Sequence, residues 1–259
     1  MRLIPLLLAS LALTAVAPTP VALVPVALAQ AQPSVAQVVE MRSEQAAPRK
    51  PVPFDPKNFD KFVGAYHLYP DTVVWVTRDG SHYLVRLTGR QTIEVFPESQ
   101  TKFFSSEIPL QYSFDTDTSG RVGGLVLHQS GMEQGAARIS AEAAKTVEAA
   151  LAARIKAKKS SPGSEAGLRH QLEMIGKGGF DYAGFSPELA ALVRSQASYA
   201  TQRFAALGAF KSLKFNSVAP GGFDIYDAVF ERGAITCWIW PLVDGKIKGL
   251  RYLPPPQDR

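Results

Sequence analysis

The alternation of apolar and polar positions is clearest between residues 110 and 129. Within residues 110–115, Tyr112 and Phe114 alternate with polar side chains, which is the two-residue period of a half-buried strand. A second run, residues 121–129, follows after a polar turn. Gly120 supplies the positive φ that such a turn needs, and Asp and Ser side chains in the turn bond to their own backbone. The pattern predicts a β-hairpin.

Similar short runs surround this hairpin, and turns of the Asp-Gly and Ser-Gly kind separate them. This spacing is typical of an antiparallel sandwich or barrel. We therefore expect about eight strands within residues 58–139. The predicted strands are residues 62–68, 73–77, 82–87, 92–96, 102–105, 110–115, 121–129 and 136–139, the last of which closes the sheet.

A helical period replaces the alternation after residue 139. Ser140 has the character of an N-cap, and Val147, Leu151 and Ile155 follow at helical spacing. The basic last turn complements the helix dipole. We expect a helix over residues 141–159, within a connector of residues 140–162. A membrane-surface helix is the alternative, but the apolar stripe is thin and has no aromatic residue.

Residues 163–254 change from helices to strands. Ser164 is expected to cap a helix that ends near Gly176, and Ser186 with Pro187 begins a longer helix that runs to Gly208. Helices followed by an antiparallel meander give an α+β layer. The four predicted strands are residues 211–218, 223–231, 234–241 and 247–253.

Composition excludes some functions. The chain has 259 residues and a formal charge of +5. Its basic residues are scattered, apart from a cluster that comprises Arg154, Lys156, Lys158 and Lys159, and no basic patch is interleaved with aromatic residues, so no nucleic-acid partner is expected. Cys237 is the only cysteine; it excludes an intramolecular disulfide and a cysteine-based zinc site, and we expect a buried, inert thiol.

The N-terminus has the pattern of an export signal. Arg2 precedes an apolar run over residues 3–29 that ends in Ala-Leu-Ala, which predicts a secretory signal peptide at residues 1–29. A retained membrane anchor is the alternative, although Pro18, Pro20 and Pro25 disfavour a regular spanning helix. We therefore expect a periplasmic or secreted bacterial protein with no membrane span after cleavage. Residues 30–57, rich in Ala, Gln, Val and Pro, are expected to be a flexible linker.

Four segments in the strand-rich region carry a family resemblance. They are residues 59–66 (FDKFVGAY), 94–99 (EVFPES), 102–104 (KFF) and 120–129 (GRVGGLVLHQ). Together they resemble the small lipocalin-like β-barrel domain that is appended to serine β-lactamase-like hydrolases and D-amino-acid peptidases. The resemblance implies no catalytic residue in the barrel, which in those relatives serves assembly or shields the active site. We expect the hydrolase domain itself to be absent from this chain.

Two motifs in the same region match the residue pattern of known sites. Ser99 and Lys102 have the spacing of the Ser-x-x-Lys motif of penicillin-recognising enzymes, but the companion motifs are missing and the match lies in a turn, so we interpret it as a coincidence. Residues 115–120 resemble the front of a calcium loop. The twelfth position, where an EF-hand needs Glu, is Val126, and we prefer the hairpin turn.

His67, His82 and His128 lie in different predicted strands. They could converge in a barrel, and hydrolytic zinc sites do use three histidines. Isolated histidines in strands are more often surface or core groups, and we predict no metal and no cofactor.

The C-terminal part resembles a second family. Residues 186–189 (SPEL), 207–208, 224–226 (DIY) and 230–231 carry a resemblance to the cystatin-like cone of the nuclear transport factor two superfamily. The resemblance implies either a ligand pocket or an enzyme site between sheet and helix, with an acid–base pair in the enzymatic members. The candidates for such a pair are Asp181, Tyr182, Asp227 and Glu231, of which Asp227 and Glu231 are expected on one strand face.

Trp238 and Trp240 are two residues apart in a predicted strand and should share a face. They could stack on a ring of a ligand. We expect instead that they pack in the core under the helices.

The predicted fold class is mostly β plus α+β: a small antiparallel lipocalin-like β-barrel (58–139), a connector helix, then an α+β cone with helices on a four-stranded antiparallel meander (163–254). We assign no catalytic, cofactor or metal residue. The expected function is that of a non-catalytic exported accessory protein in protein interaction or assembly, with itself or an exported partner. Alternatives are a binder of a small apolar ligand, and a hydrolase or isomerase that uses the cone carboxylates. A filled interior favours the first, and an open one with polar groups favours binding.

Overall fold

The structure is a computed structural model that describes residues 49–68, 70–129 and 131–253. These residues all belong to one of the two units into which the chain divides by its internal contacts, Pro33–Arg259. The predicted signal peptide, residues 1–29, and most of the predicted linker lie outside the described residues. Within the described ranges, no helix combines the length and the apolar character that crossing a bilayer requires.

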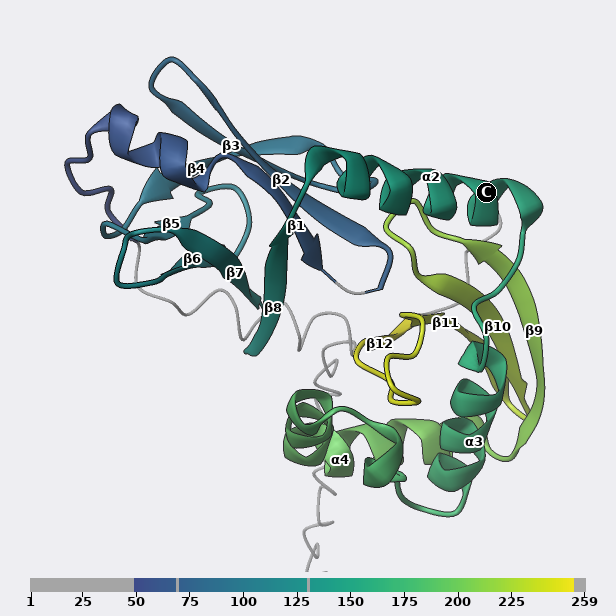
Figure 1. Cartoon of the computed structure of the whole chain (residues 1–259). Helices are drawn as coiled ribbons and strands as arrows, with labels where there is room; N and C mark the ends of the chain where they lie inside the picture. Colours follow the sequence, from purple (N-terminus) through teal and green to yellow (C-terminus); the bar gives the residue numbers. More distant parts are fainter. Residues whose placement is uncertain (1–48, 69, 130, 254–259) are drawn as a thin grey trace, which may run out of the picture. The chain divides into compact units, whose positions relative to one another are not determined.

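Eight antiparallel strands form a closed barrel in sequential order, which confirms the predicted architecture of residues 58–139 (Figure 1). Closure occurs where β8 pairs with β1, in the register Ala65 with Ile139. The strands are β1 (Gly64–Leu68), β2 (Thr72–Asp79), β3 (His82–Leu87), β4 (Thr92–Pro97), β5 (Lys102–Phe104), β6 (Leu110–Thr116), β7 (Val122–Gln129) and β8 (Met132–Ile139).

The barrel begins later than predicted. Residues Pro56–Phe62 form a 3-10 helix, η1, with Asp55 as its N-cap, so Phe62 is helical and the first strand starts at Gly64. The Asp-Pro sequence favours such a start, because proline fits the first helical position. Residues 49–57, assigned above to the linker, contact the barrel: the amide of Val52 donates to the carbonyl of Pro97, and the ring of Phe54 packs edge-on against that of Phe103.

Aromatic side chains fill the interior of the barrel. Phe59 and Phe62 of η1 have no solvent exposure, and they belong to the same core as the inward-facing residues of the strands. Phe59 stacks on Tyr83 with ring centroids 4.4 Å apart, and Phe62 stacks on Phe114 at 4.3 Å. Because these rings occupy the space that a ligand would need, the barrel is a packed core, as small barrels generally are.

The connector helix, α2 (Ala141–Ala157), confirms the predicted element and its cap. The Ser140 hydroxyl accepts from the amide of Ala143. Ala144 is fully buried and Val147 is partly buried in a small cluster with Ala65 and Val73 of β1 and β2. The apolar stripe of α2 thus packs on the outer face of the barrel.

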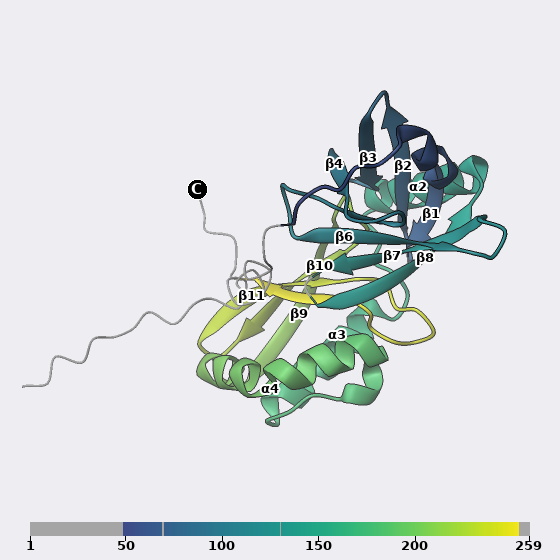
Figure 2. The same cartoon turned by 90° about the vertical axis from the view of Figure 1, so that its left-hand side faces the viewer.

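The C-terminal layer has two long helices and a four-stranded sheet, as predicted. The helices are α3 (Ser164–Gly176) and α4 (Pro187–Leu207), with a short 3-10 helix η2 (Tyr182–Gly184) between them. The sheet has the order β12-β11-β10-β9, an antiparallel meander. Its strands are β9 (Phe210–Val218), β10 (Asp224–Phe230), β11 (Gly233–Ile239) and β12 (Leu250–Leu253). In Figure 2, α3 and α4 lie on one side of this sheet.

The start of α3 differs from the prediction. Gly163 occupies the N-cap position in the left-handed region, and Ser164 is the first helical residue with a fully buried side chain that makes no capping bond. Glycine can replace a capping side chain where φ is positive. Ser186, by contrast, caps α4 as predicted and accepts from the amide of Leu189.

Register places Trp238 on the face of the sheet away from the helices. Tyr226 pairs with Cys237, and both are buried in the core under α3 and α4. Trp238 pairs with Ile225, and neighbouring positions along a strand point to opposite faces. The expected packing of Trp238 under the helices is therefore wrong. Trp240 follows the end of β11 and stacks on Phe223, with centroids 4.9 Å apart.

The turn between β6 and β7 confirms the hairpin and has a carboxylate at its centre. One oxygen of Asp117 accepts from the amides of Ser119 and Arg121, at 2.9 and 3.0 Å. Gly120 follows with φ of 81°. The hydroxyl of Ser119 also donates to Asp117. This bond contributes most, and together with the other bonds to Ser119 and Arg121 it lowers the pKa of Asp117 from 3.8 to about 2.

We predict that Asp117→Asn removes part of the acid sensitivity of the protein. A carboxyl whose pKa is lowered by folding stabilises the native state above its unfolded pKa of about 4, and this contribution is lost as pH falls towards 2. Thermal midpoints measured across this range should fall less steeply for the variant than for the parent protein. Identical slopes would contradict the role of this carboxylate.

Candidate functional site

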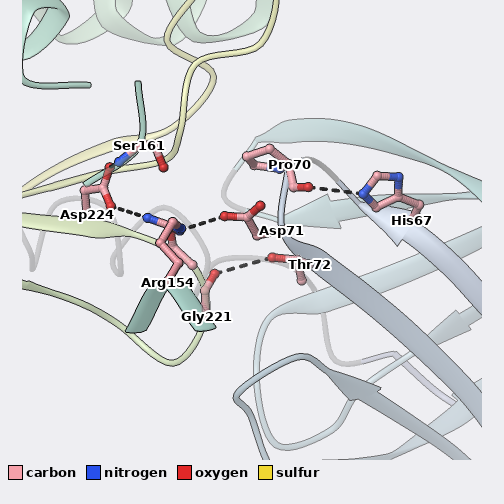
Figure 3. A network of polar contacts seen from close by, with 9 residues as sticks. His67, Pro70, Asp71, Thr72, Arg154, Ser161, Gly221 and Asp224 are labelled. Atoms are coloured by element: carbon pink, nitrogen blue, oxygen red, sulfur yellow. Dashed lines mark hydrogen bonds and ion pairs between the residues drawn. The ribbon is translucent and has the colours of Figure 1, made fainter. Parts of the chain in front are cut away.

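The guanidinium of Arg154, near the end of α2, joins three segments that are far apart in the sequence (Figure 3). Its Nη2 donates to Asp71 Oδ2 and to the carbonyl of Gly222, each at 2.6 Å. Its Nη1 donates to Asp224 Oδ1. Asp71 lies between β1 and β2, and Asp224 begins β10. One side chain thus connects the barrel, the connector helix and the sheet.

The partner Asp224 is completely buried. Its side chain has no exposure, whereas that of Arg154 is 15 % exposed, and its second oxygen accepts from the amide of Ser161 at 2.8 Å. A buried carboxylate needs such bonds, because its desolvation is costly. The sequence had placed Arg154 in a basic cluster at a helix end, so its burial between two carboxylates was not predicted.

The barrel also contacts the β9–β10 loop beside this ion pair. The hydroxyl of Thr72 donates to the carbonyl of Gly221 at 3.3 Å. Gly89, with φ of 72°, lies so close to the β9–β10 loop that a Cβ at this position would overlap the carbonyl oxygen of Pro220. Only glycine fits this approach. The β3–β4 turn of the barrel and the β9–β10 loop are therefore in direct backbone contact.

The face of the sheet opposite α3 and α4 carries a mixed set of side chains. Asp227 accepts from Asn216 at 2.8 Å and weakly from Thr236 at 3.4 Å. Val229, two residues along the same strand, is 43 % exposed, and Trp238 is partly exposed. The register places Asp227 and Thr236 between the row of Trp238 and the row of Val229, so two apolar positions flank a charged centre. Exposed apolar side chains with polar neighbours are typical of surfaces that bind another protein.

The structure does not assemble the four candidate residues of the cone into one site. Asp181 bonds to His170 at 3.0 Å, and the ring of Tyr182 lies under the guanidinium of Arg194 at 4.6 Å. Asp227 has the sheet partners described above. Each of these side chains therefore has its own structural partner.

Glu231 does not share the strand face of Asp227, which corrects the expected arrangement. β10 ends at Phe230, and the chain turns so that Glu231 accepts from the amide of Ala209 at 3.2 Å and from Lys211 at 3.1 Å. The amide bond of Ala209 and then Lys211 hold the pKa of this carboxyl below its ordinary value. Glu231 is thus a structural anion at a strand end.

The three barrel histidines have separate partners. His67 contacts the carbonyl of Pro70 at 3.2 Å, and His82 pairs with Glu94 at 2.7 Å. His128 lies between Ser113 and a carboxylate of β8. Among the described residues, no group of three or more His, Cys, Asp or Glu side chains is placed to hold a metal ion.

The remaining predicted features are structural. The hydroxyl of Ser99 accepts from the amides of Thr101 and Lys102, at 3.3 and 3.1 Å, in the turn between β4 and β5. The Ser-x-x-Lys motif is thus part of a β-hairpin turn. Cys237 is buried, and burial raises the pKa of its thiol, which agrees with an inert cysteine.

A cleft of about 260 Å³ lies where the barrel approaches the start of α4. Leu68, Met132 and Trp240 contribute apolar surface, and Glu188 and Lys248 contribute charge. Pockets for drug-sized ligands usually enclose about 300–1,000 Å³. The volume of the cleft is thus slightly below the range for drug-sized ligands.

Comparison with known proteins places the barrel. Residues 48–142 match the family model described as Domain of unknown function (DUF3471). The matched region contains all eight strands of the barrel. Penicillin-binding protein 4* of Bacillus subtilis (strain 168) is similar over 95 residues at 27 % identity, which is 37 % of this chain and 21 % of that protein. The chain therefore spans about a fifth of the length of this relative, and the barrel region is distantly related to a part of it.

We predict that Arg154→Met lowers the free energy of unfolding by about 3–5 kcal/mol, because it leaves a buried carboxylate without its cation. Arg154→Lys keeps the charge but not the planar fork, and its loss should be intermediate. Urea denaturation followed by tryptophan fluorescence measures both.

The matched control is Arg121→Ala, which removes another Arg–Asp pair whose Arg side chain is 84 % exposed. Exposed pairs contribute little, so this variant should unfold close to the parent protein. Equal losses for Arg154→Met and Arg121→Ala would contradict the central role of Arg154.

Proposed function

We propose that this chain is an exported, non-catalytic interaction protein. It associates with a second copy of itself through the face of the β9–β12 sheet opposite α3 and α4. The observation that carries the proposal is the contrast between a barrel interior filled by aromatic rings and a sheet face whose described side chains include exposed Val229 and partly exposed Trp238. A packed interior favours a scaffold, and an apolar surface patch favours an interface.

Charges of both signs on this face support a second copy as the partner. In the strand register, Lys214 of β9 lies opposite Asp227 of β10, and Arg251 of β12 lies opposite Trp238 of β11. In a two-fold interface, the same patch meets itself, so it must complement its own charges. A patch with one carboxylate between two cations can do so when the copies are antiparallel.

The distant relationship of the barrel to a region of a penicillin-binding protein supports an accessory role. We propose that the barrel is lipocalin-like in ancestry and that the C-terminal layer is a cystatin-like cone, as their motifs suggest. In this proposal the cone carboxylates Asp227 and Glu231 hold the sheet together and perform no turnover.

A second candidate function is the binding of a small apolar ligand in the cleft between β8 and α4. Its support is the apolar lining by Leu68, Met132 and Trp240. A ligand there would raise the thermal midpoint by mass action, and Met132→Glu would abolish the shift. A shift that persists in this variant would exclude the cleft.

We predict that Val229→Glu shifts the protein towards monomer. The substitution replaces an exposed apolar side chain of the interface with a negative charge, which would be desolvated there without a partner. Sedimentation velocity at several concentrations should show a dimer for the parent protein and a dissociation constant at least about tenfold weaker for the variant.

The matched control is Ile108→Glu, since Ile108 is a comparably exposed apolar residue (41 %) in the loop before β6. This variant should dimerise like the parent protein. A parent protein that is monomeric at all concentrations, or equal weakening by both substitutions, would overturn the proposal.

A further inference from the structure

Three polar side chains on the outer face of the barrel form a hydrogen-bonded chain. The hydroxyl of Ser113 on β6 is 2.7 Å from Nε2 of His128 on β7. The other ring nitrogen of His128, Nδ1, is 3.2 Å from Oε1 of Glu133 on β8. The three residues come from consecutive strands, and the cross-strand register aligns His128 with Glu133.

The carboxylate determines which way the hydrogen bonds run. A carboxylate accepts only, so Glu133 favours the tautomer of His128 that carries its proton on Nδ1. Nε2 is then the acceptor, and the Ser113 hydroxyl donates to it. This is the order of nucleophile, base and orienting acid that activates serine in hydrolases of unrelated folds.

The chain is open to small molecules. Ser113 is partly exposed, the side chain of His128 is 27 % exposed, and that of Glu133 is 73 % exposed. Val126 lies between Ser113 and Gly135 in one cross-strand row, and a Cβ at Gly135 would meet nothing within 4 Å.

We propose that Ser113 is a reactive serine that takes an acyl group from small esters with a good leaving group, with His128 as its base and Glu133 as a positioning residue. The Ser113 oxygen forms a bond to the acyl carbon while its proton passes to Nε2 of His128. The bond from that carbon to the leaving oxygen breaks, and the leaving group departs as the alcohol or, if it is acidic, as its anion. The product is an ester on Ser113.

The same geometry predicts modification without turnover. β6 pairs with β5 on one side and β7 on the other, so its backbone amides serve the sheet and do not supply the oxyanion donors on which rapid acyl transfer depends. The acyl group should therefore persist on the serine. The inference is independent of the proposed dimer, because it concerns the barrel surface and needs no second copy.

The test uses the folded, full chain and p-nitrophenyl acetate. Release of p-nitrophenolate gives the rate, and peptide mapping by mass spectrometry locates the acetyl group. We expect one acetyl group on Ser113, its loss in Ser113→Ala, and acetylation of Ser113 at least about 100-fold slower in His128→Gln, the scale of general-base assistance. Glu133→Gln should have an intermediate rate, and Glu133→Asp should recover part of it.

The matched control is Ser119→Ala, which removes an exposed serine that bonds to a carboxylate and not to an imidazole; it should leave the rate unchanged. Thermal unfolding confirms that each variant is folded. Acetylation confined to lysines, or an equal rate of Ser113 acetylation in His128→Gln and the parent protein, would overturn the proposal.

Discussion

A cation held between two carboxylates connects the barrel to the C-terminal sheet. Arg154 contacts Asp71 and Asp224, which are separated from it by 83 and 70 positions. The electrostatic attraction is strong because water is largely excluded, and for the same reason each charge would be unfavourable alone. The network therefore ties the last turn of α2 to both the barrel and the sheet, and it gives the connector a fixed role beyond its thin apolar stripe.

The interior of the barrel is filled and leaves no space for a ligand. Phe59 and Phe62 enter the core from a 3-10 helix that precedes the first strand. A barrel of eight strands has an interior that side chains can fill, and here aromatic rings do so. What this domain offers a partner is consequently its outer face, where strand register and not an internal cavity decides which side chains meet.

Sequence patterns predicted most of the elements, because their causes are local. Alternation along β6 and β7, the caps Ser140 and Ser186, and the glycine turns each depend on residues a few positions apart. The order of the strands in the sheet followed from short turns. The start of α3 and the helical state of Phe62 differ from the prediction, because Gly163 takes the cap position beside Ser164 and an Asp-Pro start places Phe62 in η1.

The candidate sites depended on register, and the sequence contains no local sign of it. Trp238 changed faces because its pairing with Ile225 sets its direction, and Arg154 resembled any basic residue at a helix end. Ser113, His128 and Glu133 become neighbours only once three strands are aligned. The same alternation that predicted these strands could have suggested a polar outer row, but not which of its members bond.

The close approach at Gly89 has a consequence for how this protein could be recombined. Gly89 of the barrel lies against the carbonyl of Pro220 in the β9–β10 loop, and there is no space between them for even one methyl group. A barrel taken from a relative could replace residues 58–139 only if it carries glycine at the equivalent corner. Chimeras that ignore this corner would force the β9–β10 loop away, and Asp224 and its cation would separate with it.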